Sequence, residues 1–495
     1  MLIAKINAGR DDEDPAGQDE GGSAGPEPWA APIATAPLDA RVSLPGSKSL
    51  TNRELILAAL AEGPGVLRAP LHSRDSALMI DGLRTLGVRI DELPSPGPFG
   101  ADLRITPAAE LTGSTSIACG LAGTVMRFMP AVAALALGPT AFDGDPYARK
   151  RPMRPVLDAL RALGADIADE GRGALPFTVH GTGSLRGGRV ELDASLSSQF
   201  VSGLLLAAPR FDEGVHVVHT GERLPSVPHI EMTLEVLRAR GVTADSPAPG
   251  EWRVAPGPIR ARDLKVEPDL SNAAPFLAAA LVAGGSVAVP NWPAETTQVG
   301  KLLPELLAAF GATAHFDPHT TAPDSELRIE LQHRLRGAEL RIPEAGELAP
   351  TLVGLAALAA HGTGEGDGEA SEITGIGHIR QHETDRIAAL VAEINGLGGR
   401  AEELPDGIAI RPATLHGGSW RSYEDHRMAT TGALIGLRVP GVVVDDIDCT
   451  AKTLPEFPRL WDAMLGGSDP VTGPVSPAGD PLALGGLRDG MSGRL

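Results

Sequence analysis

The sequence predicts an α/β fold assembled from six copies of one unit, and two periodic series of helices support this prediction. In the first series, an apolar helical run ends at a glycine, and the six glycines follow one another at steps of 68 to 87 residues. In the second series, a helix rich in Ala and Leu begins with polar residues, at steps of 74 to 78 residues. Because the two series alternate, we expect a unit of about 75 residues that reads strand, helix, strand, helix, strands.

Each copy of the first series predicts a helix that stops at a glycine with positive φ. Glycine tolerates the left-handed backbone that closes many helices. Strand-like residues follow the first five copies, as expected for a strand after each helix. The six glycines are Gly87, Gly164, Gly241, Gly311, Gly398 and Gly466.

The second series predicts buried helices over 47–61, 122–137, 197–208, 270–283, 347–360 and 424–437. Their polar residues concentrate at the helix starts, where backbone N–H groups are unpaired and the helix dipole is positive. Several such starts that point into one cleft would bind anions strongly. The alternative is a closed array of apolar helices without a shared site. The markers of this series are Ser49, Thr124, Ser198, Asn272, Leu348 and His426.

The amino-acid composition and net charge indicate which classes of binding partner to expect. The formal charge of −20 argues against nucleic acid, which requires clustered Lys and Arg. Two Cys in 495 residues do not suggest a disulfide framework. No run approaches the roughly 20 apolar residues of a membrane span. We therefore expect small molecules as partners, with no nucleic acid and no membrane.

Both ends of the chain differ in composition from the rest. Residues 1–36 are acidic and rich in Gly and Pro, which predicts a disordered arm. They resemble neither a secretory signal nor a transit peptide, so we expect a cytoplasmic location. Residues 467–495 are similarly rich in Gly and Pro, which predicts a flexible tail.

The stretch LPGSKSLTNR, residues 44–53, carries the first candidate anion site. Gly46, Ser47, Lys48 and Ser49 resemble the end of a nucleotide-binding phosphate loop, but the glycine five residues before Gly46 is missing. The nucleotide interpretation therefore fails on spacing, although Lys48 still begins a predicted helix.

Further basic residues lie at or just before helix starts in both halves of the chain. Two multiply charged anions, held side by side, would explain this distribution. His378 and His382 are four residues apart next to Glu383, but the order H-E-x-x-H and a third ligand are absent, so we expect no metal. The basic set is Lys48, Arg53, Arg151, Arg386, Arg427 and Lys452.

Seven segments occur in order along the chain: LPGSKSLTNR, AGTVMR, KRPM, SLSSQF, HETDR, DHRM and TAKTLPEFP. Together they resemble the 5-enolpyruvylshikimate-3-phosphate synthase family of carboxyvinyl transferases. The resemblance covers residues 37 to 466, nearly all of the predicted folded chain.

The resemblance implies a two-domain inside-out α/β barrel with three βαβαββ units in each domain, which agrees with the six copies counted above. One domain would hold residues 48–263, and the other would combine residues 37–47 with 264–466. The chain would cross twice between the domains, and the cleft between them would close on substrate. We expect a monomer.

The resemblance also implies a reaction. The enolpyruvyl group of phosphoenolpyruvate would pass to the 5-hydroxyl of shikimate 3-phosphate through a tetrahedral intermediate, and phosphate would leave. No cofactor is implied. The reaction needs a base for the hydroxyl, an acid for the methylene, and cations for the phosphates and carboxylates.

Carried over position by position, the family's functional residues fall into three groups. The acid–base residues would be Lys48, Glu347, Glu383 and His426. The residues that bind shikimate 3-phosphate would be Lys48, Ser49, Arg53, Ser197, Ser198, Gln199, Ser226, Glu347, His378 and His382. The residues that bind phosphoenolpyruvate would be Lys48, Gly123, Thr124, Arg151, Gln199, Arg386, Arg427 and Lys452.

Two positions compete for the base. Many members of the family have Asp before the fifth inner helix, whereas this chain has Glu344 and Glu347. We favour Glu347, because it is nearer the helix start and Pro350 suits the first helical turn.

The chain departs from the family at three other positions. Many members have Asn and Lys where His378 and His382 stand, and His382 would be partly charged near neutral pH. We therefore expect affinity for shikimate 3-phosphate to fall as pH rises through about 6 to 8. Phe128 replaces a frequent Pro, which puts inhibitor sensitivity near Gly123 in doubt.

Three alternatives remain. The sister transferase that acts on UDP-N-acetylglucosamine usually has a reactive Cys in a loop of its first half, but the loop at 142–152 has none. The related RNA-terminal phosphate cyclase is disfavoured by the acidic charge. A protein without activity that only binds anions is disfavoured by the intact set of Lys48, Glu347, Glu383 and Lys452.

Overall fold

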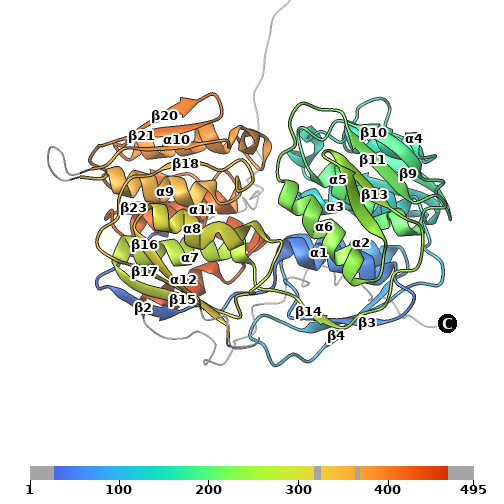
Figure 1. Ribbon diagram of the computed structural model, residues 1–495, viewed down its shortest axis with the longest axis horizontal. Coiled ribbons are helices and arrows are strands. Elements are labelled where there is room, and N and C mark those ends of the chain that lie inside the picture. The colour runs from blue at the N-terminus through green and yellow to red at the C-terminus, as the bar shows by residue number, and fades with distance from the viewer. Residues whose placement is uncertain (1–26, 317–324, 363–367, 467–495) are drawn as a thin grey trace, which may run out of the picture.

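The computed structural model describes residues 27–316, 325–362 and 368–466, which form two lobes that lie side by side (Figure 1). The strands of the described residues form six small sheets, one for each predicted unit. The six-unit α/β fold predicted from the sequence is therefore confirmed.

Three of the units are continuous in sequence and share one topology. In each, the first two strands are parallel and the last strand lies antiparallel to the second. The third strand lies at the edge of the sheet, next to the last. The second unit contains β6 (Thr115–Ala118), α3 (Gly123–Ala133), β7 (Leu137–Asp143), α4 (Arg154–Ala162), β8 (Asp166–Ala168) and β9 (Phe177–Thr182). The third contains β10 (Gly188–Leu192), α5 (Gln199–Ala207), β11 (Val215–His219), α6 (Val227–Ala239), β12 (Ala244–Ala248) and β13 (Glu251–Val254). The fifth contains β18 (Glu339–Arg341), α9 (Ala349–Ala360), β19 (Ser371–Thr374), α10 (Arg386–Gly396), β20 (Arg400–Leu404) and β21 (Gly407–Arg411).

The first and fourth units exchange their first strands. β2 (Leu38–Arg41) precedes α1 in sequence but pairs in parallel with β15 of the fourth unit. β14 (Leu264–Lys265) precedes α7 but pairs in parallel with β3 of the first. The first unit otherwise contains α1 (Lys48–Ala59), β3 (Gly65–Arg68), α2 (Arg74–Thr85), β4 (Arg89–Leu93) and β5 (Asp102–Thr106). The fourth contains α7 (Leu270–Ala283), β15 (Gly285–Pro290), α8 (Leu303–Ala309), β16 (Ala312–Phe316) and β17 (Glu326–Leu331).

Because of this exchange, the chain passes twice between the lobes, and the two passages touch. Gly46 forms a β-bridge with Pro268. The amide of Lys48 also donates to Oδ2 of Asp269 at 3.1 Å. The predicted division at residue 264 puts β14 in the second domain, whereas β14 pairs with β3 of the first unit; the domain bounds stay a prediction.

The sixth unit is completed by the start of the described chain. It contains β22 (Gly418–Trp420), α11 (His426–Gly436), β23 (Val442–Val444) and α12 (Phe457–Leu465). β1 (Trp29–Ala30) pairs antiparallel with β23, at the position that the last strand occupies in the other units. Residues 27–36 therefore do not belong to a disordered arm as predicted, whereas residues 1–26 and the tail 467–495 lie outside the described residues.

The helices of the second series form the centre of each lobe. α1 and α3 both contact α5 in the first lobe, and α7, α9 and α11 contact one another in the second. Nearly every residue of α3, α7, α9 and α11 is buried, as their Ala- and Leu-rich sequences predict. Helices at the centre and sheets outside give the inside-out arrangement that the resemblance implies.

The first series ends its helices as predicted in five of six copies. The glycines after α2, α4, α6, α8 and α10 have φ between +80° and +109°. Gly466 after α12 has φ −78°, so the prediction of a positive φ is wrong there. No helix in the described ranges combines the length and apolar character that crossing a membrane requires.

Candidate active site

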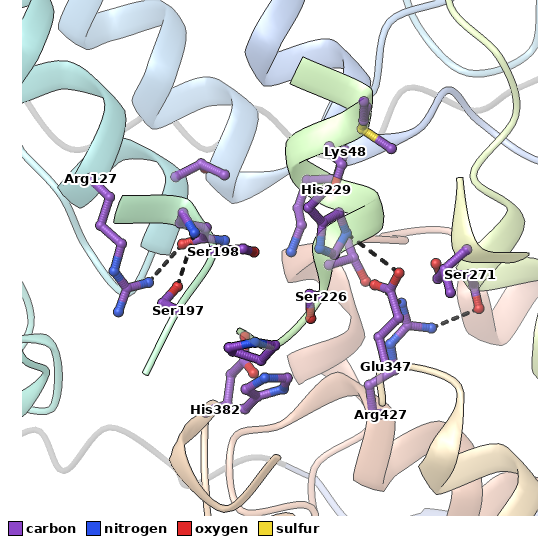
Figure 2. Close-up of a pocket in the computed structure, with 18 of the residues that line it drawn as sticks. Lys48, Arg127, Ser197, Ser198, Ser226, His229, Ser271, Glu347, His382 and Arg427 are labelled. Carbon is purple, nitrogen blue, oxygen red and sulfur yellow. Dashed lines mark hydrogen bonds and ion pairs between the residues drawn. The ribbon is translucent and has the colours of Figure 1, made fainter. Parts of the chain in front are cut away.

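A polar cleft lies between the lobes, where the starts of the inner helices face one another. It encloses about 1100 Å³, including space open to solvent. Figure 2 shows that Ser197, Ser198 and Arg127 reach it from the first lobe, and Glu347 and Arg427 from the second. The sequence-predicted residues that line it are Lys48, Ser49, Thr124, Arg151, Ser197, Ser198, Gln199, Ser226, Glu347, His382, Glu383, Arg386, His426 and Arg427.

Three other predicted residues border the cleft without lining it. Gly123 begins α3, and a Cβ added there would lie 2.8 Å from Nη1 of Arg127 and 3.0 Å from Oε1 of Gln199, so only glycine fits without a shift. Lys452 and His378 line two adjoining pockets. Nε2 of His378 is buried without a hydrogen-bond partner among the described residues.

Arg53 lies beneath the cleft rather than in its wall. Its side chain is 2% exposed, and it donates to Oγ1 of Thr233 at 2.8 Å, to the carbonyl of Ser49 at 2.9 Å and to the carbonyl of His229 at 2.9 Å. Burial lowers its pKa to about 9, against the opposing effect of Glu347. In this arrangement Arg53 holds α1 against α6, and its contact with substrate stays a prediction.

Glu347 precedes α9 and points into the cleft, whereas Glu344 is exposed. Its Oε1 lies 3.5 Å from Nε2 of His229, and its Oε2 lies 3.9 Å from Nη2 of Arg427. Burial alone would raise the pKa of Glu347, but His229, Arg427 and a hydrogen bond from Ser271 outweigh it and hold the pKa well below its ordinary value. Glu347 is therefore an ionised carboxylate that can accept a proton.

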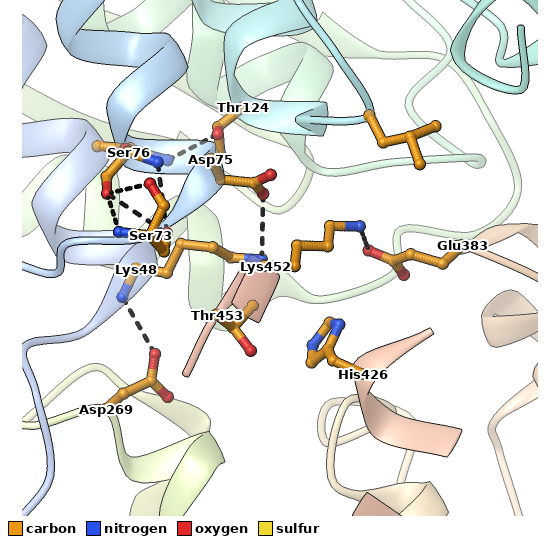
Figure 3. Close-up of polar contacts among 12 residues, drawn as sticks. Lys48, Ser73, Asp75, Ser76, Thr124, Asp269, Glu383, His426, Lys452 and Thr453 are labelled. Atoms are coloured by element: carbon orange, nitrogen blue, oxygen red, sulfur yellow. Dashed lines mark hydrogen bonds and ion pairs between the residues drawn. The ribbon is translucent and has the colours of Figure 1, made fainter. Parts of the chain in front are cut away.

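Glu383 is held between two cations on the opposite wall. Nζ of Lys452 lies 2.7 Å from Oε1, and Nη2 of Arg386 lies 2.9 Å from Oε2. Burial opposes ionisation, but these two cations keep the pKa of Glu383 well below its ordinary value. Figure 3 shows the pair of Lys452 and Glu383 beside His426.

His426 is neutral in this setting. Burial, Arg427 and Lys48 hold its pKa well below the ordinary value of histidine. Its Nδ1 is buried without a hydrogen-bond partner in the described part of the chain. His426 therefore offers an uncharged imidazole near Arg427 and Lys48.

The expectation that His382 is partly charged near neutral pH is wrong. Nη1 of Arg386 lies 2.9 Å from Nδ1 of His382, and a guanidinium can only donate, so Nδ1 must be an unprotonated acceptor. Burial and the charge of Arg386 hold the pKa of His382 well below its ordinary value. Arg386 is itself fixed by Asp425, whose Oδ2 accepts from Nε at 2.7 Å.

Sequence reasoning missed several groups at this site. The sequence motifs assigned no role in the site to Arg127, which lines the cleft and donates to Oε1 of Gln199 at 2.7 Å. Its spacing of four residues from Gly123 places both on one helix face, and this signal could have identified it. Asp75 lies 3.7 Å from Nζ of Lys48 (Figure 3). Asp269 and Ser271 also line the cleft, and their place at the start of α7, in the second series of helices, could have identified them. His229 lines it too, and no spacing pattern connects His229 with the cleft.

The local backbone at Ser226 is unusual for a non-glycine residue. Ser226 has φ +54° and ψ +46° at the start of α6, and it lines the cleft. Left-handed conformations of this kind are strained and tend to persist where function or surrounding structure requires them.

Among the described residues, no group of three or more His, Cys, Asp or Glu is arranged to hold a metal ion.

Comparison with known sequences agrees with this geometry. Residues 33–461 match the family model of EPSP synthase, described as 3-phosphoshikimate 1-carboxyvinyltransferase. A 3-phosphoshikimate 1-carboxyvinyltransferase of Kocuria rhizophila is 54% identical over 443 residues, which cover 88% of this chain and 96% of that protein. One of Mycobacterium ulcerans is 49% identical over 446 residues, covering 89% of this chain and 99% of that protein.

Solved structures support the fold. An EPSP synthase of Acinetobacter baumannii superposes with a TM-score of 0.72 at 24% identity and covers 88% of this chain and 97% of its own. A second structure of EPSP synthase from the same organism gives 0.71 at 23% identity. With the match to the family model over most of its length and relatives near 50% identity, the chain belongs to the EPSP synthase family.

Proposed function

We propose that this chain is a 3-phosphoshikimate 1-carboxyvinyltransferase of aromatic amino acid biosynthesis. It transfers the enolpyruvyl group of phosphoenolpyruvate to the 5-hydroxyl of shikimate 3-phosphate and releases phosphate. The observation that carries the proposal is one cleft in which two ionised carboxylates, Glu347 and Glu383, stand among cations from both lobes. We also propose a cytoplasmic location, and the monomeric state stays a prediction.

The two substrates bind in different parts of the cleft. Shikimate 3-phosphate binds along the starts of α1, α5 and α6, where hydroxyl groups and Lys48 supply donors for its phosphate. Phosphoenolpyruvate binds toward Arg151, Arg386, Arg427 and Lys452, with the small Gly123 allowing close approach. Gln199, which Arg127 orients, lies between them.

Proton transfer follows from the charge states. Glu347 accepts the proton of the 5-hydroxyl while the oxygen bonds to the enol carbon, and the methylene of phosphoenolpyruvate receives a proton to become a methyl group. The methyl group then loses a proton as the C–O bond to phosphate breaks, which restores the double bond. Lys48 stabilises the charge that develops between the two substrates.

Glu383 changes its protonation state as substrate binds. In the empty cleft, Lys452 and Arg386 keep it ionised. When the phosphate and carboxylate of phosphoenolpyruvate engage these cations, the pKa of Glu383 rises, because the opposing charges are shared. It then carries the proton that is given to the methylene and later removed from the methyl group.

The sister transferase acting on UDP-N-acetylglucosamine is not favoured. The matched family and the named relatives are 3-phosphoshikimate 1-carboxyvinyltransferases. Cys119 is fully buried, and burial raises the pKa of its thiol to about 12, so it does not act as a reactive thiolate.

A phosphate-release assay tests the proposal. Phosphate should appear from phosphoenolpyruvate only when shikimate 3-phosphate is present, and UDP-N-acetylglucosamine should not replace it. Calorimetric binding of both substrates without turnover would instead identify an inactive anion-binding homologue.

A further inference from the structure

His229 contacts the candidate base from the opposite lobe. It belongs to the first turn of α6 in the first lobe, whereas Glu347 lies two residues before α9 in the second. Nε2 of His229 lies 3.5 Å from Oε1 of Glu347, and each side chain is 23% exposed (Figure 2). The base therefore has a partner that belongs to the other wall of the cleft.

The backbone beneath His229 is held firmly. Its carbonyl accepts hydrogen bonds from Nη2 of Arg53 at 2.9 Å and from Oγ1 of Thr233 at 3.0 Å. Its amide donates to the carbonyl of Ser226 at 3.0 Å. The imidazole thus projects from a rigid helix start, which is the condition for orienting another group.

The two carboxylate oxygens of Glu347 have different neighbours. His229 faces Oε1, and Arg427 of α11 lies nearer Oε2, at 3.9 Å. A carboxylate held on one oxygen presents the other in a fixed direction, as general-base catalysis requires.

We propose that His229 is a positioning residue for Glu347, so that the base is fully oriented only when the two lobes close. This inference rests on the proposed carboxyvinyl transfer. Closure would then assemble the base as well as exclude water, which couples proton abstraction to the bound state of the cleft.

The proposal has a consequence for the pH profile. The groups that favour the ionised form of Glu347 are His229 from α6, Arg427 from α11 and Ser271 from α7, with Arg386 and Arg53 acting at longer range. Removing His229 takes away one of these groups and raises the pKa of Glu347. Because the base must be ionised, the acid limb of kcat/KM should move to higher pH.

The test compares three variants of the full chain in the phosphate-release assay. His229→Phe keeps the ring but removes the N–H, and His229→Gln keeps a donor. His216→Phe is the matched control. Nε2 of His216 lies 2.8 Å from Oε2 of Glu251, so this histidine also pairs with a carboxylate, but both residues belong to the first lobe and lie away from the cleft. Melting temperatures are measured for all three.

We expect His229→Phe to lower kcat by about tenfold to a hundredfold, with KM for phosphoenolpyruvate changed less than about threefold, and to shift the acid limb upward. His229→Gln should recover most of kcat, and His216→Phe should match the wild type. In the Glu347→Gln background, His229→Phe should cause little further loss.

Two results would overturn the inference while leaving the proposed function intact. The first is that the wild-type chain is active and that His229→Phe leaves both kcat and the acid limb of the kcat/KM profile unchanged. The other is an equal loss in His229→Phe and His229→Gln with an unmoved acid limb, which would mark a purely structural role. An inactive wild-type chain would instead refute the proposed function. If His229→Phe does not fold, the acid limb of His229→Gln decides, because a neutral donor replaces the imidazole there.

Discussion

At the scale of single residues, opposing effects set the charge states in the cleft. Burial alone would neutralise Glu347 and Glu383, yet neighbouring cations keep both ionised. The same burial, with cations nearby, keeps His382 and His426 uncharged. A cleft rich in Arg and Lys therefore favours carboxylates as proton acceptors and neutral imidazoles as hydrogen-bonding groups.

Substitution of the two competing glutamates distinguishes them. Glu347→Gln should lower kcat by about a hundredfold to ten-thousandfold, because the cleft loses its base. Glu344→Gln should stay within about twofold of the wild type, because Glu344 is exposed outside the cleft. Steady-state kinetics measure both, and the reverse pattern would assign the base to Glu344.

His382 should not contribute to the pH dependence of substrate affinity. Because Nδ1 accepts from Arg386 and burial holds the pKa of His382 well below its ordinary value, the ring should lose no charge between about pH 6 and 8. KM for shikimate 3-phosphate should follow parallel pH profiles in the wild type and in His382→Gln. His180→Gln, at an exposed position, serves as the control. A profile that flattens only in His382→Gln would contradict this assignment.

At the scale of elements, similar units use the same sequence signals with one local exception. The glycine after each outer helix allows a left-handed turn into the next strand, and the five such turns are followed by β4, β8, β12, β16 and β20. Gly466 closes α12 without positive φ. A shared motif therefore predicts the end of a helix more securely than its backbone conformation.

Alanine substitutions at two of these glycines should differ in their effect. Gly164 has φ +109° with its nearest neighbours at ordinary contact distance, so Gly164→Ala should cost about 1 to 2 kcal/mol through backbone strain alone. Gly466→Ala should change stability by less than about 0.5 kcal/mol, since its φ suits any residue. Urea unfolding midpoints measure both, and equal effects would show that strain is not the cause.

At the scale of the whole molecule, two separate cores are joined by two short passages. One cluster of buried apolar residues runs from Leu55 to Ile259, and the other combines Ala31 to Leu44 with Leu270 to Met464. The passages near Gly46 and Pro268 connect them. This arrangement suits lobes that move relative to each other and close on ligand.

Without ligand, the two lobes should unfold in separable steps. Trp252 lies in the core of the first lobe, whereas Trp292, Trp420 and Trp461 lie in that of the second. Fluorescence of Trp252→Phe should therefore follow the second lobe only, and its urea transition should differ from that seen by circular dichroism.

Ligand should bring the two transitions together. Shikimate 3-phosphate at a hundredfold excess over its Kd should stabilise the liganded unit by about 2.7 kcal/mol. Coincident transitions in the absence of ligand, for both probes, would refute independent lobes.

Much of the fold could be predicted from sequence because its signals are local and repeated. The spacing of glycines and of Ala-rich helices gave the six units and their inner helices, and the polar helix starts indicated an anion site. The motifs identified most residues that line the cleft, and the position of Glu347 beside α9 separated it from Glu344.

Other features depend on contacts between distant segments. No local signal predicts that Trp29 and Ala30 complete the sixth sheet or that Leu264 and Lys265 pair with β3, because strand pairing depends on partners more than a hundred residues away. The sequence by itself therefore determined the repeat, the family and the chemistry of the cleft. Only the tertiary structure decided that Arg53 is buried, that His382 is neutral and that His229 faces Glu347, because burial and charge are set by neighbours that the fold brings together.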